Sequence, residues 1–220
     1  MKIKIKICGN LFFENSVMVA SHQPDYMGWI FSPFSPRRIR LHSAEKIILQ
    51  IRKTFPAIKH VAVFAGNSVR DIAKIVEGRP LFDCLQIVEG AGFFQDLRRY
   101  PGIATGLELI PAVRVRKNIT DMDLVQFGRV PFFVFDTYVK GRPGGTGKVM
   151  NTDNIRKVTR PYLLAGGLNA DNVAGILSAF GKKLPLGVDV SSGIEDSPGL
   201  KNRGLVELFM KRVKEAGGSV

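Results

Sequence analysis

The chain has 220 residues, of which 45% are hydrophobic, and a chain of this size buries roughly 70 to 75% of its unfolded surface on folding. This composition excludes disordered and fibrous proteins, and no apolar run approaches the roughly 20 residues of a membrane-spanning helix. Lys and Arg outnumber Asp and Glu by 32 to 19, a formal net charge of +13, which favours an anionic partner such as nucleic acid or a phosphorylated small molecule.

The sequence contains two cysteines, Cys8 and Cys84. They can form one bridge at most, and nothing around them suggests a disulfide scaffold or a Cys/His zinc cluster. The Lys-rich start lacks the long apolar stretch and the small-residue cleavage site of a signal peptide. We therefore expect reduced thiols, no resident metal, a cytoplasmic protein and no association with membranes.

Short apolar runs alternate along the whole chain with helix-like stretches. Because the runs are nearly continuous blocks of apolar residues, they indicate parallel strands that are buried on both faces. The stretches between them have apolar residues three and four apart, which puts one apolar stripe on each helix. The predicted strands are residues 2–7, 27–31, 60–65, 84–88, 107–114, 132–136, 162–165 and 187–191. The clearest predicted helices are residues 44–53, 68–77, 170–179 and 200–214.

Eight strand-helix units of about 27 residues fill the chain, close to the compact end of the range for (β/α)8 barrels. We therefore predict an α/β fold, a TIM barrel, in which residues 1–220 form a single domain. An open doubly wound sheet is disfavoured because residues 8–11 lack its glycine fingerprint. The Gly-rich residues 141–148 do not form a nucleotide-binding P-loop, since Arg142 and Val149 occupy positions where that motif needs Gly and Ser or Thr.

Polar side chains are predicted at the carboxyl ends of three strands, where barrels gather their functional groups. Cys8 ends the first strand, and its thiol can act as a general base if a positive environment favours the thiolate. Asp136 ends the sixth strand, where partly apolar surroundings favour a general acid. Arg37 follows the second strand, and a guanidinium binds a carboxylate or phosphate at two points. This pattern suits proton transfer between neighbouring carbons, as in an aldose-ketose isomerisation.

Structural interpretations of the same residues stay open. Cys8 also fits a small buried apolar residue, and Asp136 also fits a helix cap or an ion pair with Lys140 or Arg142. Cys84 opens the fourth strand, at the opposite end of the barrel, and is interpreted as packing. Arg38 is interpreted as a solvated neighbour of Arg37.

The loops after the seventh and eighth strands contain glycine and serine. Barrels often bind phosphate in these two loops, through backbone N–H groups and a helix N-terminus. Glycine lets the backbone approach a phosphate closely, and serine adds a hydroxyl donor. The sequence therefore predicts a phosphate site at Gly166, Gly167, Ser192 and Gly193, with simple tight turns as the alternative.

A set of longer motifs runs through nearly the whole chain. They are Lys6 to Gly9, Gly28 to Phe31, Ser35 to Arg37, Asp136 with Gly144 to Lys148, Leu164 to Asn169, Gly187 to Glu195, and Pro198-Gly199. In these motifs the chain resembles the phosphoribosylanthranilate isomerases of tryptophan biosynthesis. One departure is at the end of the fourth strand, where the family usually has Gln-Leu-His-Gly and this chain reads Gln86-Ile87-Val88-Glu89.

The resemblance implies an Amadori rearrangement of N-(5-phosphoribosyl)anthranilate, without metal or cofactor. Asp136 would protonate the ring oxygen as general acid, and Cys8 would take the proton from C2 of the sugar. Arg37 would hold the anthranilate carboxylate, Gln86 would bind substrate, and the two Gly/Ser loops would hold the phosphate. The implied partner is a small phosphorylated substrate, and the protein is expected to be a monomer or a homodimer.

Two alternatives remain beside this interpretation. One is a divergent barrel that isomerises or only binds another phosphosugar. The other is a basic nucleic-acid-binding protein, which is disfavoured because the basic residues are spread along the chain without a known binding motif. The lysines at positions 2, 4 and 6 alternate with isoleucines, which predicts an ordinary strand with one solvated face or end.

Overall fold

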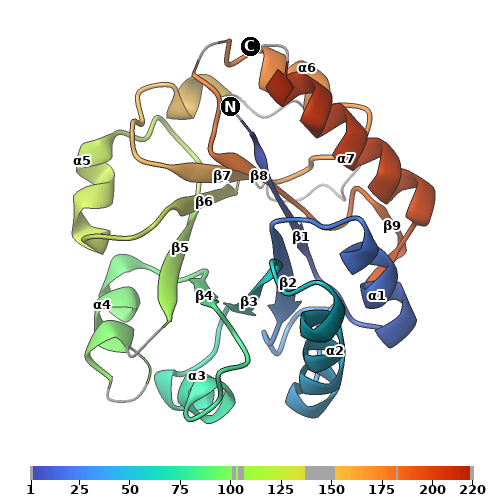
Figure 1. The fold of residues 1–220 in the computed structure, drawn as a ribbon. Coiled ribbons are helices and arrows are strands. Elements are labelled where there is room, and N and C mark those ends of the chain that lie inside the picture. Colours follow the sequence, from blue (N-terminus) through green and yellow to red (C-terminus); the bar gives the residue numbers. More distant parts are fainter. Residues whose placement is uncertain (1, 101–102, 104–106, 137–151, 182, 219–220) are drawn as a thin grey trace.

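The computed structural model describes residues 2–100, 103, 107–136, 152–181 and 183–218. Eight parallel strands follow one another in chain order and close into a barrel, with the helices in an outer ring (Figure 1). The predicted (β/α)8 barrel is therefore confirmed. The strands are β1 (Lys4–Cys8), β2 (Tyr26–Ile30), β3 (Lys59–Phe64), β4 (Cys84–Ile87), β5 (Glu108–Arg114), β6 (Phe133–Asp136), β7 (Tyr162–Ala165) and β8 (Gly187–Val190).

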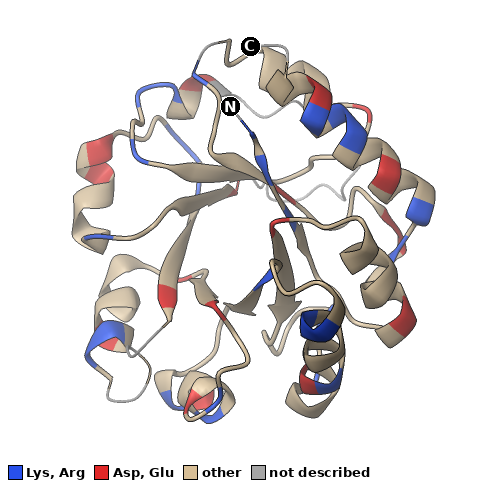
Figure 2. Cartoon of the chain, in the orientation of Figure 1, with Lys and Arg blue, Asp and Glu red and all other residues tan. Residues whose placement is uncertain are grey.

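The helices connect successive strands, and none within the described residues is long and apolar enough to cross a membrane. They are α1 (Phe13–Ser21), α2 (Leu41–Thr54), α3 (Val69–Val76), α4 (Ala91–Arg99), α5 (Asp121–Leu124), α6 (Val173–Ser178) and α7 (Arg203–Gly218), with 3-10 turns η1 (Val125–Phe127) and η2 (Thr152–Ile155). Lys and Arg lie on elements all around the barrel, interleaved with Asp and Glu, and do not gather on one side in this view (Figure 2).

The predicted helix over residues 200–214 is wrong at its start. Its first two residues form β10 (Leu200–Lys201), which pairs antiparallel with β9 (Glu195–Ser197). Gly199, with φ of +86°, turns the chain between the two strands. Asn202 then accepts a hydrogen bond from the Leu205 amide at 3.0 Å and caps α7. A hairpin therefore lies beside the barrel mouth, between β8 and α7.

Two apolar layers hold the barrel together. The larger layer packs the outward faces of the strands against the helices, and Ile5 and Ile7 of β1 belong to it. The smaller layer fills the barrel interior and includes Cys8, Val61 and Leu163. Since both faces of most strands are buried, these strands appear in the sequence as nearly continuous apolar runs.

The solvated lysine face expected for the first strand is absent at Lys6. Its side chain is fully buried, with 0% of its surface exposed, and Lys4 donates a hydrogen bond to the hydroxyl of Tyr26 at 3.3 Å. In a closed barrel the alternate positions of a strand face the interior rather than solvent. The expectation of a solvated face was therefore wrong at Lys6, whereas the solvated end is present, since Lys2 is 79% exposed.

Candidate active site

One cavity of about 220 Å³ lies at the carboxyl ends of the strands. It contacts side chains from β1, β4, β6 and β8 and the loops that follow β2, β7 and β8. Seven of the predicted site residues line it, namely Cys8, Arg37, Gln86, Asp136, Gly166, Gly167 and Ser192. A second cavity of about 610 Å³ adjoins it and shares Val88, Ala112 and Arg114 with it.

Gly193 is the predicted site residue that does not line this cavity. It forms a parallel β-bridge with Asn169, which joins the loop after β7 to the loop after β8. A Cβ atom at Gly193 would overlap the carbonyl oxygen of Leu168. The glycine therefore allows the two loops to meet, and the structure gives it a packing role at the rim of the cavity.

Cys8 is the last residue of β1, and 7% of its surface is exposed. Burial raises the pKa of its thiol, while the nearby charges of Lys6 and Lys201 act in the opposite direction. A thiolate formed here is a strong base that two cations stabilise. The other cysteine, Cys84, lies at the opposite end of the barrel, as predicted, and its thiol contacts Glu108 at 3.4 Å.

Beneath Cys8, Lys6 and Asp189 form an ion pair inside the barrel. The Lys6 ammonium lies 2.8 Å from Oδ2 of Asp189, and the two side chains are 0% and 8% exposed. Burial by itself would lower the pKa of Lys6, but the Asp189 carboxylate raises it above the usual value. A fully buried cation therefore lies next to the thiol, although Lys6 itself does not line the cavity.

Asp136 ends β6, is half-buried and lines the cavity. It and Cys8 border the same space from different sides of the barrel, as the sequence predicted. Its predicted partners Lys140 and Arg142, and the Gly144 to Lys148 motif, lie outside the described residues.

Three buried oxygen atoms at the cavity accept no hydrogen bond from the described residues. They are Oε1 of Gln86, Oδ1 of Asp189 and Oγ of Ser191. A buried polar atom without a partner costs about 1 to 3 kcal/mol, so such atoms usually face a ligand or ordered water. These acceptors suit a ligand that carries several hydroxyl groups.

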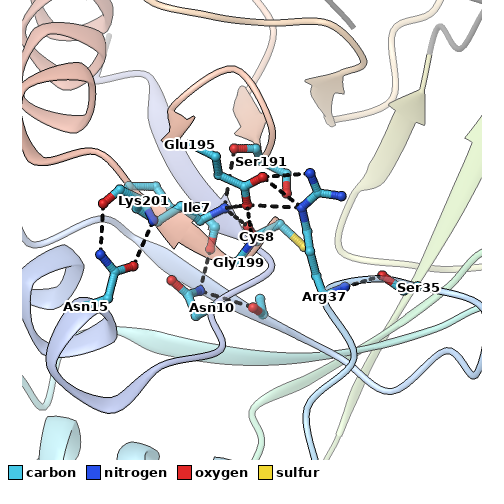
Figure 3. Close-up of polar contacts among 11 residues, drawn as sticks. Ile7, Cys8, Asn10, Asn15, Ser35, Arg37, Ser191, Glu195, Gly199 and Lys201 are labelled. Carbon is cyan, nitrogen blue, oxygen red and sulfur yellow. Dashed lines mark hydrogen bonds and ion pairs between the residues drawn. The ribbon is translucent and has the colours of Figure 1, made fainter. Parts of the chain in front are cut away.

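Arg37, Glu195 and Lys201 form a charged group at the rim, which we call the Glu195 cluster (Figure 3). Nε of Arg37 donates to both carboxylate oxygens of Glu195, at 3.0 and 2.9 Å, and Nη2 donates to Oε2 at 2.6 Å. Nζ of Lys201 donates to Oε1 from the other side, at 2.7 Å. Burial would raise the pKa of Glu195, but the bonds from Arg37 and Lys201 lower it. Arg38 is exposed, as expected.

The predictions assigned no role to Lys6, Asp189, Glu195 and Lys201. The sequence contained a signal for Lys6 and Asp189, because a charged residue within an apolar strand is rarely left unpaired. Glu195 and Lys201 lie in the hairpin that was interpreted as loop and helix, so their convergence on Arg37 could not be anticipated.

None of the three histidines lines the cavity. His60 is buried in β3, accepts a hydrogen bond from Nε1 of Trp29 at 3.2 Å, and burial lowers its pKa to about 4. Within the described parts of the chain, no group of three or more His, Cys, Asp or Glu residues could hold a metal ion.

A parallel eight-stranded barrel with a polar cavity at the carboxyl ends of its strands defines a (β/α)8-barrel enzyme. Residues 5–212 match the family described as N-(5'phosphoribosyl)anthranilate (PRA) isomerase. The chain belongs to this family, which confirms the resemblance found in the sequence motifs.

Individual relatives agree with this assignment. The chain is 35% identical over 215 residues to N-(5'-phosphoribosyl)anthranilate isomerase of Leptospira borgpetersenii serovar Hardjo-bovis, covering 97% of this chain and 95% of that protein. The crystal structure of phosphoribosyl anthranilate isomerase from Thermotoga maritima matches with a TM-score of 0.76 and 27% identity, over 97% and 99% of the two chains. A crystal structure of phosphoribosyl anthranilate isomerase in complex with reduced 1-(o-carboxyphenylamino)-1-deoxyribulose 5-phosphate matches with a TM-score of 0.72 and 25% identity, over 97% and 99% of the two chains.

Proposed function

We propose that the chain isomerises N-(5'-phosphoribosyl)anthranilate to 1-(2-carboxyphenylamino)-1-deoxyribulose 5-phosphate by an Amadori rearrangement. The observation that carries the proposal is the single cavity lined by Cys8, Asp136 and Arg37 together with Gly167 and Ser192. It supplies a base, an acid, a carboxylate ligand and a phosphate loop within one space.

Asp136 acts first, as the general acid. It donates a proton to the ring oxygen of the ribose while the C1–O bond breaks, and the lone pair of the anthranilate nitrogen forms a C=N bond to C1. The ring opens to a protonated imine, which retains the N–H hydrogen of the anthranilate amine, and the Asp136 carboxylate that remains faces the cavity. A half-buried carboxyl at the end of a strand is suited to this exchange of one proton.

Cys8 acts second, as the general base. Its thiolate removes the proton from C2, and the electrons of the C–H bond form a C1–C2 double bond while the C=N electron pair returns to the nitrogen as a lone pair. The resulting enolamine tautomerises to the ketone product, so no oxidant or reductant is consumed. Lys6 and Lys201 favour the thiolate by lowering the pKa of Cys8 against the effect of burial.

Binding uses the remaining groups. The loops with Gly166, Gly167 and Ser192 receive the phosphate, joined by Gly193 at the rim, and Arg37 receives the anthranilate carboxylate. Oε1 of Gln86 accepts a hydrogen bond from a sugar hydroxyl, which satisfies an acceptor that otherwise has no partner among the described residues.

Turnover of the substrate tests the proposal directly. Phosphoribosylanthranilate is generated in place from anthranilate and phosphoribosyl pyrophosphate by the preceding enzyme, and its loss is followed by fluorescence. Cys8→Ala and Asp136→Asn should each lower kcat by at least about 100-fold, the low end for an acid-base residue. Cys84→Ala, which removes the other thiol, should retain activity. A chelator should leave turnover unchanged, since no proposed step uses a metal. Absence of turnover by the folded wild-type protein would refute the proposed function.

A further inference from the structure

Two cations share one carboxylate in the Glu195 cluster, which leaves one positive charge in excess at the rim of the cavity. The side chain of Glu195 is 4% exposed and that of Lys201 is 0% exposed, while Arg37 is 19% exposed and lines the cavity. Arg37 is therefore the only member of the cluster with a side that a ligand can reach.

Arg37 contacts Glu195 through one edge of its guanidinium, the edge formed by Nε and Nη2. No described residue accepts a hydrogen bond from its Nη1. A guanidinium has five N–H donors in a planar fork, so a second carboxylate can bind the edge formed by Nη1 and Nη2. The position of this free edge is set by the edge that Glu195 holds.

Glu195 is itself fixed by the hairpin and by Lys201. Gly199 donates its amide to Oε1 at 3.2 Å, and Nζ of Lys201 also donates to the carbonyl oxygens of Cys8 and Ser191, at 2.5 and 3.3 Å. All three ammonium protons of Lys201 therefore have acceptors. Nδ2 of Asn15 donates a hydrogen bond to the carbonyl oxygen of Lys201, and Oδ1 of Asn15 accepts one from the Lys201 amide, both at 2.8 Å. These two bonds attach the hairpin to α1 (Figure 3).

The stem of Arg37 is confined as well. A Cβ atom at Gly9 would lie 2.6 Å from Cδ of Arg37, so the arginine packs directly over the backbone that follows Cys8. The hydroxyl of Ser35 accepts a hydrogen bond from the Arg37 amide at 3.1 Å. Both ends of the side chain are held before any ligand arrives, which lowers the entropic cost of binding.

We propose that Glu195, fixed by Lys201, is a positioning residue that aims Arg37 at the aglycone carboxylate, and that the cluster selects a carboxylate-bearing aminoaldose over a neutral one. This inference rests on the proposed function, in which Arg37 binds anthranilate. Glu195 does not touch the substrate and acts only through Arg37.

The direction in which KM changes in Glu195→Gln distinguishes a positioning role from a purely electrostatic one. Glu195→Gln adds positive charge to the site, so charge alone predicts a lower KM for the anionic substrate. Loss of positioning predicts a KM raised about tenfold, the value of one charge-assisted hydrogen bond, with a smaller effect on kcat. Asp196→Asn is the matched control, because it makes the same charge change at the adjacent exposed position, and it should leave KM unchanged. A KM that falls or stays constant in folded Glu195→Gln overturns the inference.

Two further variants keep the result interpretable. Glu195→Gln with Lys201→Met restores the net charge of the wild-type cluster and removes the buried unpaired ammonium, yet its KM should also be raised about tenfold. In an Arg37→Ala background, Glu195→Gln should have no further effect on KM, because a residue that acts through Arg37 is not additive with its loss. An additive effect contradicts the positioning role.

Binding of free anthranilate and anthranilamide separates failure of this inference from failure of the proposed function. The two probes differ only in carboxylate against carboxamide, and their binding needs no turnover. Wild type should bind anthranilate about tenfold more tightly than anthranilamide, and Glu195→Gln should abolish that preference. Equal binding of both probes by wild type, or a preference that survives in Glu195→Gln, overturns the inference even if the enzyme turns over its substrate.

Discussion

Lys6 and Asp189 are register partners across the β1–β8 junction, and their side chains form a 2.8 Å ion pair inside the barrel. The pair lies where the first strand meets the last, so it belongs to the closure of the barrel. It also lies directly beneath Cys8, where the Lys6 ammonium lowers the pKa of that thiol and the Asp189 carboxylate raises it. Closure of the fold and the electrostatics of the site therefore depend on the same two side chains.

Removing one partner of this pair should be costly. Lys6→Met leaves the Asp189 carboxylate buried without its cation, and the free energy of unfolding should fall by about 3 to 5 kcal/mol. Lys2→Met breaks the exposed pair with Asp25, in which Lys2 is 79% exposed, and should cost less than about 1 kcal/mol. Lys6→Met with Asp189→Leu should recover much of the loss. Denaturant unfolding measures all three, and equal losses for the two Lys→Met variants would contradict a stabilising buried pair.

The pH dependence of activity should follow Cys8. In the proposed mechanism the thiolate is the active form, and burial raises the pKa of the thiol, so kcat/KM should still increase with pH above about 8.5, the usual cysteine value. Alkylation by iodoacetamide in a Cys84→Ala background measures the same ionisation directly. The two profiles should coincide, whereas a kcat/KM that levels off at lower pH would assign the base to another group.

The sequence was sufficient to predict the barrel, because most strands are buried on both faces and appear as nearly continuous apolar runs, with the Lys/Ile alternation of β1 as the exception. The predicted strand ends agree with the structure to within two residues, as in β5 and β8. The small hairpin β9–β10 was not predicted, since residues 200–214 show helical spacing and a strand of two residues leaves no periodic signal. Local patterns therefore identified the barrel and only part of its mouth.

Site residues were predictable where their place at the end of a strand puts them at the barrel mouth. Ion pairs between residues far apart in the sequence were not predictable. Cys8 and Asp136 were correctly placed at the barrel mouth because each ends a strand. Arg37 was found in its loop, but Glu195 is 158 positions away, and Lys6 is 183 positions from Asp189. Such pairs follow from barrel closure and hairpin geometry, which a single sequence does not encode as a local pattern.

Gly28 faces Cys8 in the register of β1 and β2, and a Cβ atom there would lie 2.6 Å from the thiol sulfur. Gly28→Ala should therefore displace the Cys8 side chain and lower kcat by about 10- to 100-fold, as a shift of about 1 Å can do. Affinity for ribose 5-phosphate should be unchanged, because the loops proposed to bind phosphate follow other strands. The control is Gly92→Ala, whose Cβ atom meets nothing within 4 Å. If both variants keep wild-type kcat, the thiol sulfur does not need its present position.

Gly167 offers a test of the phosphate loop that separates binding from backbone strain. Its φ of +67° is unfavourable for alanine, and an added Cβ atom would point into open space at the cavity. Gly181 has φ of +55° and equally open surroundings, but it is not among the residues that line the cavity. Each Gly→Ala change should cost about 1 to 2 kcal/mol of unfolding free energy, the penalty for a left-handed conformation.

Only Gly167→Ala should weaken binding of inorganic phosphate and ribose 5-phosphate, by about tenfold if a single hydrogen bond to the phosphate is lost. Isothermal titration of both variants provides the comparison. Because the strain is matched, a difference in affinity must come from the added methyl group at the cavity. Equal affinities in the two variants would mean that the phosphate binds elsewhere on the barrel mouth.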